Sequence, residues 1–328
     1  MQMLLRDFRG IFGRHCETTA VGSLLCSLGL EISEPLLFGV GEGLSYVVQQ
    51  ATMRDFPFIG GRISSDLISK NICTNLSLDL NVHETSSPNQ AWQTVKQYLD
   101  EGTPVGLKLD CYHLEYFETP YHFAGHHVAM YGYDDTYGYL VDTAQQGRYV
   151  KSTLESIGRA RNETGPMSSR NLCYSIGNSS GAKNLKEAVL IGLRKNTEAY
   201  LSPHTDNVGF NGIHKTALEI EKWFARSGNV ERDFKTAAVM MERAGTGGAL
   251  FRNIYRDFLE QAYVLLGDAR LEQGRLRFVE IAALWTRVSS MFNQIGERRD
   301  GALLGPLVET LHELADMEAE TMELLKSI

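Results

Sequence analysis

Hydrophobic and polar residues follow two different patterns along the chain, and the change falls near residue 180. Before it, short apolar runs rich in aromatic and β-branched residues have the length of strands. These runs are residues 104–109, 126–134, 137–143 and 171–177. The polar stretch between the second and third runs is a turn signal, so these two strands should form an antiparallel hairpin. Helices are expected at 16–28, at 36–48, and at 88–101, where Pro88 occupies a first helical turn.

Beyond the Gly/Ser/Asn-rich stretch at 178–183, apolar residues recur at intervals of three and four, a period typical of amphipathic helices. Helices are expected at 184–200, 210–227, 231–243, 249–267, 272–295 and 302–326. The pattern therefore predicts an α+β domain with an antiparallel sheet over residues 1–178 and an all-α helical bundle domain over residues 184–328.

Composition narrows the class of protein. The chain of 328 residues is 43% hydrophobic and 22% charged, as in ordinary globular proteins, and its length fits two domains. A net charge of −8 argues against nucleic acid or an anionic membrane as a partner. Because no apolar run is long enough for a signal sequence or a membrane span, we expect a soluble, cytoplasmic protein. Five cysteines without a CxxC pair predict neither a disulfide framework nor a zinc site.

Cys16 directly precedes an expected helix, and Arg14 and His15 stand just before it. The amides and the positive dipole end of a helix N-terminus favour a thiolate, and basic neighbours act in the same sense. A lowered thiol pKa is what a nucleophilic cysteine requires. The alternative is a small buried side chain, the usual place of a free cysteine, so a base is needed to decide.

The segments "GHHVAMYGYDD" and "GYLVDTAQQG" resemble the histidine strand and the following strand of papain-like cysteine enzymes. The position of Gly132 in that pattern selects His126 over His127. Neighbouring strand residues face opposite sides, so only one of the two histidines can face the helix that bears Cys16. Asp142 lies across the hairpin, where it can accept a hydrogen bond from the imidazole. Cys16, His126 and Asp142 form a candidate triad.

Other histidines have simpler interpretations. His127 is expected on the opposite face as an exposed or core residue, and His15, His113 and His122 as surface or supporting groups. A zinc site of His122, His126, His127 and Asp110 is disfavoured, since ligands on an extended strand need even offsets to share a face. No metal is therefore expected.

More of the chain resembles the family typified by the acyltransferase of butirosin biosynthesis. The matching motifs are His15-Cys16-Glu17, Ser33-Glu34, Phe38-Gly39 with Gly41-Glu42-Gly43-Leu44, the strand with Asp110, Leu114 and Tyr116, and "GTGGALFRNIYRDFLEQA" at 245–262. This resemblance implies a papain-like fold used for acyl transfer. An acyl group would leave the phosphopantetheine arm of an acyl carrier protein for Cys16 and pass to a small-molecule amine, with no cofactor of the enzyme's own.

The resemblance also marks candidate substrate-binding residues. Glu17, Glu34 and Glu42 could bind a cationic acceptor, although capping of helices or turns is the alternative for Glu17 and Glu42. Asp110 and Tyr116 match the family strand. The glycine-rich turn before Arg252 could cradle a phosphate with help from that residue, or be a plain connection between helices.

One departure and several alternatives remain. Papain-like peptidases carry an oxyanion-hole glutamine where this chain has Gly10, so the Cys16 amide is the one donor that can be named. A cysteine hydrolase or thioesterase, an amide-forming cyclase, and a non-catalytic binding protein are the alternative functions. The helical domain could cover the active site, bind the carrier protein or form a homodimer.

Overall fold

The computed structural model describes residues 2–50, 56–119, 121–165, 167–178, 184–242 and 248–328. The chain forms two compact units, the first of Met1–Leu37 and Ser65–Lys183 and the second of Phe38–Ser64 and Asn184–Ile328. The expected linker at 178–183 lies outside the described residues except for residue 178.

The first unit is built on an antiparallel sheet. Its strand order is β4 (Asp79–His83), β9 (Cys173–Gly177), β5 (Val105–Leu109), β6 (His126–Tyr133), β7 (Tyr137–Val141) and β8 (Tyr149–Thr153), and β1 (Met3–Leu4) pairs with β6. The predicted hairpin is the β6–β7 pair, in which Tyr133 lies opposite Gly138. Strands β1, β4 and β8 were not predicted from the sequence.

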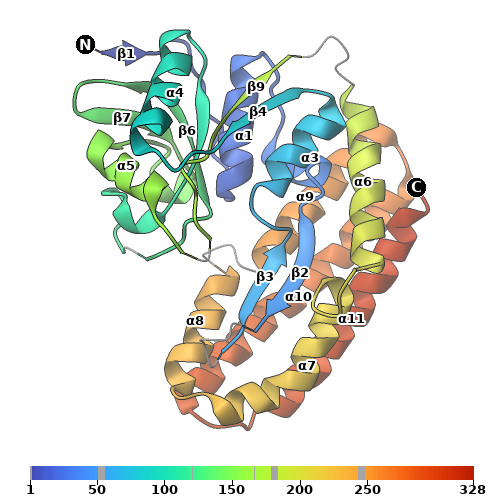
Figure 1. Ribbon diagram of the computed structural model, residues 1–328. Coiled ribbons are helices and arrows are strands. Elements are labelled where there is room, and N and C mark those ends of the chain that lie inside the picture. The colour runs from blue at the N-terminus through green and yellow to red at the C-terminus, as the bar shows by residue number, and fades with distance from the viewer. Residues whose placement is uncertain (1, 51–55, 120, 166, 179–183, 243–247) are drawn as a thin grey trace. The chain divides into compact units, whose positions relative to one another are not determined.

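Helices cover both faces of this sheet (Figure 1). Helices α4 (Pro88–Asp100) and α5 (Leu154–Asn162) lie on one face, and α1 (Cys16–Ser27) and α3 (Leu67–Leu76) lie on the other. Val95 of α4 and Ile157 of α5 are buried in one core with Val128 and Met130 of β6. Because strand side chains alternate, these two β6 residues define the face that looks toward α4 and α5.

Gly132 occupies a position where only glycine fits without rearrangement. A Cβ atom there would lie 2.6 Å from the carbonyl oxygen of Met3, because strand β1 approaches β6 at this point. The glycine that marks the histidine strand in the sequence therefore has a packing reason.

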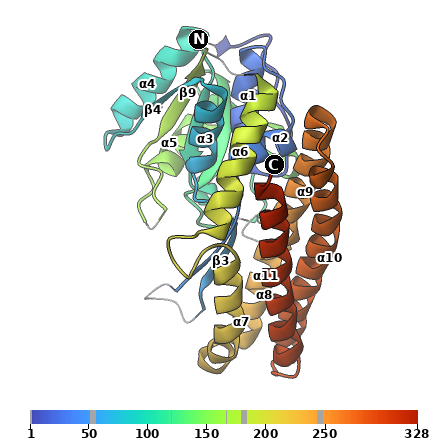
Figure 2. The ribbon, with the colours of Figure 1, turned by 90° about the vertical axis from the view of Figure 1, so that its right-hand side faces the viewer.

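The second unit consists of a β-hairpin and a set of long helices (Figure 2). The hairpin is formed by β2 (Leu44–Gln49) and β3 (Phe58–Arg62). The helices are α6 (Leu185–Leu201), α7 (Gly209–Arg226), α8 (Val230–Glu242), α9 (Ala249–Leu266), α10 (Ala269–Arg298) and α11 (Leu304–Lys326). The expected fold class, an α+β region with an antiparallel sheet followed by a helical region, is confirmed. Among the described helices, none is long and apolar enough to cross a membrane.

The helix expected at 36–48 is wrong in its second half. Helix α2 (Glu34–Val40) ends early, and Glu42 adopts a left-handed conformation with φ of 58°. The chain then enters β2, where Val48 pairs with Ile59. The β-branched residues of this stretch favour a strand once a partner is available, and β3 supplies that partner.

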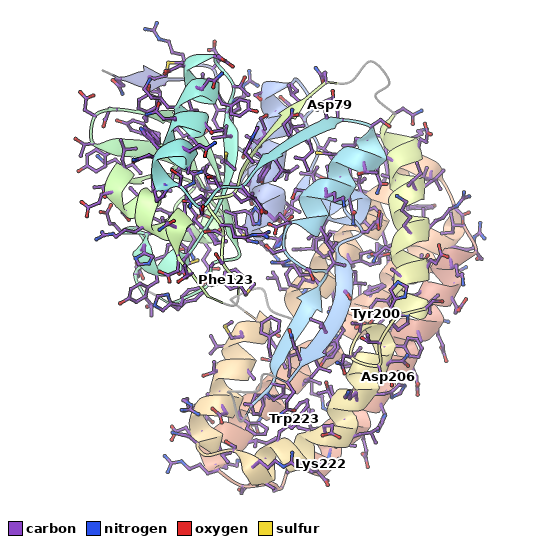
Figure 3. The ribbon with its side chains drawn as sticks, viewed as in Figure 1. Asp79, Phe123, Tyr200, Asp206, Lys222 and Trp223 are labelled. Carbon is purple, nitrogen blue, oxygen red and sulfur yellow. The ribbon has the colours of Figure 1, made fainter. Side chains whose placement is uncertain are left out.

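A network of polar side chains is buried inside the second unit. Glu318 of α11 accepts hydrogen bonds from Arg252 Nε and Nη2, both at 2.8 Å, and from Trp285 Nε1 at 2.6 Å. The hydroxyl of Tyr200, labelled on α6 in Figure 3, donates to the same carboxylate. Arg252 also donates to the carbonyl of Gly61 in β3 at 3.2 Å. The network therefore links three helices and the hairpin to Glu318.

Candidate active site

Cys16 is the first residue of α1 and is half-buried, whereas the helix behind it is buried from Glu17 to Leu25. His15 forms the N-cap, and its Nδ1 accepts a hydrogen bond from the Thr18 amide at 3.4 Å. The thiol thus stands at the N-terminal end of a helix dipole, where an anion is favoured.

The structure joins His126 and Asp142 by a hydrogen bond of 2.8 Å between Nε2 and Oδ2. Because an ionised carboxylate only accepts, Nε2 carries the proton and Nδ1 is the ring nitrogen left for chemistry. Asp142 is fully buried and also accepts from the Tyr116 hydroxyl at 2.8 Å and from the Thr143 amide at 2.6 Å. These donors stabilise the ionised carboxylate in a position where water does not reach it.

Electrostatics favour a charged imidazole at this site. Burial alone favours the neutral ring, but the charge of Asp142, with smaller contributions from Cys111 and Cys16, raises the pKa of His126 well above its ordinary value. The raised pKa favours the imidazolium, the form that an ion pair with a cysteine thiolate requires. Cys16 thus acts on the charge of the imidazole in the same direction as Asp142.

Residues near Cys16 and Asp142 are also joined directly. The carbonyl of Gly13 accepts a hydrogen bond from the Ala144 amide at 3.0 Å. This bond ties the loop that precedes Cys16 to the turn that follows Asp142. Cys16 and His126 are each the first residue of their element, so the candidate nucleophile and the candidate base both stand where regular structure begins.

The two adjacent histidines face opposite sides of the sheet, as the alternation of strand side chains predicts. His126 shares its side with Val128 and Met130, which pack with α4 and α5. His127 instead faces the side of α1 and α3. The hydrogen bond to Asp142 distinguishes His126 from its neighbour.

Sequence reasoning missed two aromatic residues beside His126. The ring of Phe117 stands perpendicular to the imidazole with centroids 5.4 Å apart. Tyr121 lies close enough for Cys111, His126 and Cys16 to affect the pKa of its hydroxyl, which burial and the cysteines raise. Their spacing ahead of the histidine strand follows no regular period, so the sequence carried no signal for their position.

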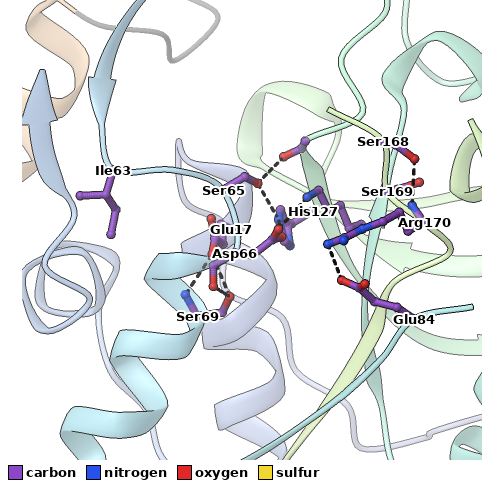
Figure 4. A network of polar contacts seen from close by, with 12 residues as sticks. Glu17, Ile63, Ser65, Asp66, Ser69, Glu84, His127, Ser168, Ser169 and Arg170 are labelled. Carbon is purple, nitrogen blue, oxygen red and sulfur yellow. Dashed lines mark hydrogen bonds and ion pairs between the residues drawn. The ribbon is translucent and has the colours of Figure 1, made fainter. Parts of the chain in front are cut away.

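A second polar cluster surrounds His127 of β6 (Figure 4). His127 Nε2 lies 3.1 Å from Ser65 Oγ and 3.3 Å from Asp66 Oδ1, and Lys108 Nζ lies 2.6 Å from Asp66 Oδ2. Burial tends to raise the pKa of Asp66, but hydrogen bonds and charge from His127 and Lys108 lower it overall. The cluster was missed because the helix that follows Asp66 was not predicted.

Glu17 and Asp110 are engaged in local structure. Glu17 is fully buried, and its Oε1 accepts from the amide of Ser69 at 2.9 Å and from its hydroxyl at 2.8 Å. Asp110 is almost fully buried and accepts from the amides of Tyr112 at 2.8 Å and Phe123 at 3.2 Å. These contacts order α3 and the loop after β5, and they argue against direct contact with a substrate.

The remaining candidates fall at different places. Tyr116 binds Asp142, and the Glu34 carboxylate binds the amides of Arg14 and His15. Glu42 lies in the second unit, 3.7 Å from Lys195. Arg252 is fully buried against Glu318, so its guanidinium is occupied within the fold. Residues 245–247 of the glycine-rich turn lie outside the described residues.

The departure at Gly10 has a steric cause. A Cβ atom at this position would lie 2.8 Å from both methyl groups of Val141, and the Gly10 amide donates to the Tyr149 hydroxyl at 3.0 Å. A glutamine could not be accommodated here unless Val141 moved. In the described part of the chain, no group of three or more His, Cys, Asp and Glu side chains is arranged to hold a metal ion.

Solved structures that are similar to part of the chain include two bacterial peptidases. The peptidase domain of Streptococcus ComA, described as a bi-functional ABC transporter involved in quorum sensing, is 11% identical, with a TM-score of 0.36, over 53% of this chain and 100% of that chain. A putative C39-like peptidase from Bacillus anthracis is 16% identical, with a TM-score of 0.38, over 55% and 100% respectively. No curated protein matches the chain.

Two family models match the sequence. The model of butirosin biosynthesis protein H, N-terminal, matches residues 15–143, which include Cys16, His126 and Asp142. The model of a domain of unknown function, DUF4872, matches residues 155–325. The resemblance predicted from the sequence is thereby confirmed. The chain belongs to the DUF4872 family, whose model covers more than half of it, and its residues 15–143 match the N-terminal model of butirosin biosynthesis protein H.

Proposed function

We propose that the protein is an acyltransferase that moves an acyl group from a carrier-protein thioester to an amine through Cys16. The observation that carries the proposal is the buried hydrogen bond between His126 and Asp142, close to a half-buried cysteine at a helix N-terminus. Asp142 fixes the imidazole with Nδ1 available, and the raised pKa of His126 supports a thiolate–imidazolium pair.

In the first step the Cys16 thiolate attacks the thioester carbonyl of the phosphopantetheine arm. A bond from Sγ to the acyl carbon forms, the bond to the pantetheine sulfur breaks, and the imidazolium gives its proton to the leaving thiolate. One thioester replaces another, so this exchange is close to balanced in free energy. The Cys16 amide is available to stabilise the oxyanion.

In the second step the amine attacks the acyl-enzyme, and neutral His126 takes its proton. Collapse of the tetrahedral intermediate expels Cys16 as the thiolate and leaves an amide. Amide formation is favourable and drives the sequence forward. A hydrolase would follow the same steps with water as the acceptor, and a cyclase would use an amine of the acyl chain itself.

The test is intact-protein mass spectrometry after incubation with an N-acetylcysteamine thioester, a small surrogate of the carrier arm. We expect one acyl adduct on the wild-type protein, none on Cys16→Ala, and discharge by added primary amines that is much faster than discharge by water. An adduct lost to water at the same rate with and without amines would favour a hydrolase. An adduct that persists on Cys16→Ala would remove the proposal.

A further inference from the structure

Glu34 makes more hydrogen bonds to the loop before Cys16 than does any other side chain in the described part of the first unit. Both of its oxygens lie 2.9 Å from the Arg14 amide, and Oε1 also accepts from the His15 amide at 2.8 Å and from the Thr18 hydroxyl at 3.0 Å. Hydrogen bonds of this kind to a carboxylate are stronger than those between neutral groups. They fix the two residues that directly precede the nucleophile.

The loop is built to admit this carboxylate. A Cβ atom on Gly13 would lie 2.1 Å from Glu34 Oε1, so a larger residue there would displace the side chain. The carbonyl oxygen of Gly13 accepts a hydrogen bond from the amide of Ala144, a residue that lies just beyond Asp142 in the sequence. The loop is thus held between Glu34 and the strand end that carries the histidine's partner.

We propose that Glu34 is a positioning residue that fixes the first turn of α1, and with it the Cys16 thiol, relative to His126. The inference rests on the proposed role of Cys16 as the nucleophile. It replaces the expectation from sequence that Glu34 binds a cationic acceptor, because both carboxylate oxygens already accept from the protein. A displacement of about 1 Å in a reacting group is enough to slow a reaction substantially.

The two roles predict different reactivity of Cys16 toward small thiol reagents. We would measure its modification by neutral methyl methanethiosulfonate and by cationic 2-aminoethyl methanethiosulfonate, with peptide mass spectrometry to assign the site. Positioning predicts that Glu34→Gln and Glu34→Asp slow both reagents by the same factor, about tenfold. Glu34→Asp keeps the negative charge but shortens the side chain by one methylene group, so it distinguishes an effect of the carboxylate's position from an effect of its charge. Gly13→Ala, which displaces the carboxylate sterically, should have the same effect and serves if a Glu34 variant does not fold.

Controls are available on the same segment. Glu31 is exposed and pairs only loosely with Arg9 at 3.6 Å, so Glu31→Gln should leave the Cys16 rates within about twofold. Cys26, at the other end of α1, is an internal reference, because general loosening of the fold would raise its modification rate in the Glu34 variants.

Rates within twofold of the wild type for both Glu34 variants would overturn the proposal. A slower modification of Cys16 by the cationic reagent alone, with the rate for the neutral reagent unchanged, would also overturn the proposal and would indicate a cation-binding site. Neither outcome depends on acyl transfer, so a wild-type protein that forms no acyl adduct would reject the proposed function without deciding the role of Glu34.

Discussion

The two units each bury a carboxylate beside a basic side chain, Asp142 beside His126 and Glu318 beside Arg252, and the pairs differ in what the base can do. Arg252 is permanently charged: burial tends to lower the pKa of its guanidinium, but the charge and hydrogen bonds of Glu318 outweigh this and leave it raised. His126 can both bind and release a proton, and only one of its ring nitrogens is used by Asp142.

Their surroundings differ in the same way. Glu318 accepts hydrogen bonds from three side chains and Arg252 also bonds Gly61, so the pair is saturated inside the helical unit. The Asp142 pair is instead coupled electrostatically to Cys16, a half-buried thiol at the start of a helix. Burial and charge alone therefore do not mark a catalytic group. A titratable partner next to a nucleophile does.

The largest expected effect is the loss of the base. His126→Ala should slow acylation of Cys16 about 10⁴-fold, because the thiolate loses its counter-ion and the leaving thiolate loses its proton donor. The measurement is the rate of adduct formation from a thioester surrogate. His127→Gln is the matched control, since His127 faces the Asp66 cluster, and a comparable loss in that variant would contradict the assignment.

A smaller effect, on stability alone, is expected in the helical unit. Glu318→Ala leaves a buried arginine without its counter-charge and should lower the free energy of unfolding by about 3–5 kcal/mol, measured by urea denaturation. Glu320, on the same helix, pairs with Arg277 at 3.4 Å on the surface. Glu320→Ala should cost no more than about 0.5 kcal/mol, and equal losses in the two variants would refute the view that the buried network is the stabilising one.

Replacing the Asp142 carboxylate should shift the alkaline limb of the pH–rate profile. In Asp142→Asn the negative charge that raises the pKa of His126 is gone, while burial continues to favour the neutral ring. The pKa of the imidazole then falls, so the alkaline limb of the pH–rate profile shifts to lower pH, with a loss of rate of about 10² at the optimum. An unshifted limb would mean that another group sets it, and Asp134→Asn, in the β6–β7 turn, is the control.

The smallest effect concerns Tyr116, which donates to the same Asp142 oxygen as His126. Tyr116→Phe removes one hydrogen bond and should reduce acylation about fivefold through the position of Asp142. The KM for the amine should not change. Exposed Tyr112 is the control, and a rise in KM in Tyr116→Phe with acylation intact would instead support the substrate contact expected from the sequence.

Local patterns explain what could be predicted. The β6–β7 hairpin brings His126 and Asp142 together through one tight turn, so the pairing follows from alternation and turn chemistry alone. The long helices after residue 184 were predicted close to their observed bounds because each has a continuous apolar face. Strand β4 escaped prediction because most of its residues are exposed and polar, and its place in the sheet depends on pairing with β9.

The features that were missed depend on residues distant in sequence. The partner of Arg252 is Glu318, and no local pattern connects them. In the same way, the Ser-Glu motif at Glu34 suggested a substrate contact, whereas folding brings its carboxylate to the amides of Arg14 and His15. Sequence identified the residues, but their roles follow from tertiary contacts.

The pH dependence of Cys16 alkylation by iodoacetamide, in the wild type and in Asp142→Asn, tests the central claim most directly. An ordinary thiol has a pKa of about 8.5. If His126 and Asp142 activate Cys16, the wild-type alkylation rate stays high far below that pH, and the variant loses this reactivity at acidic pH. A wild-type profile that follows an ordinary thiol, unchanged by the substitution, would contradict the account.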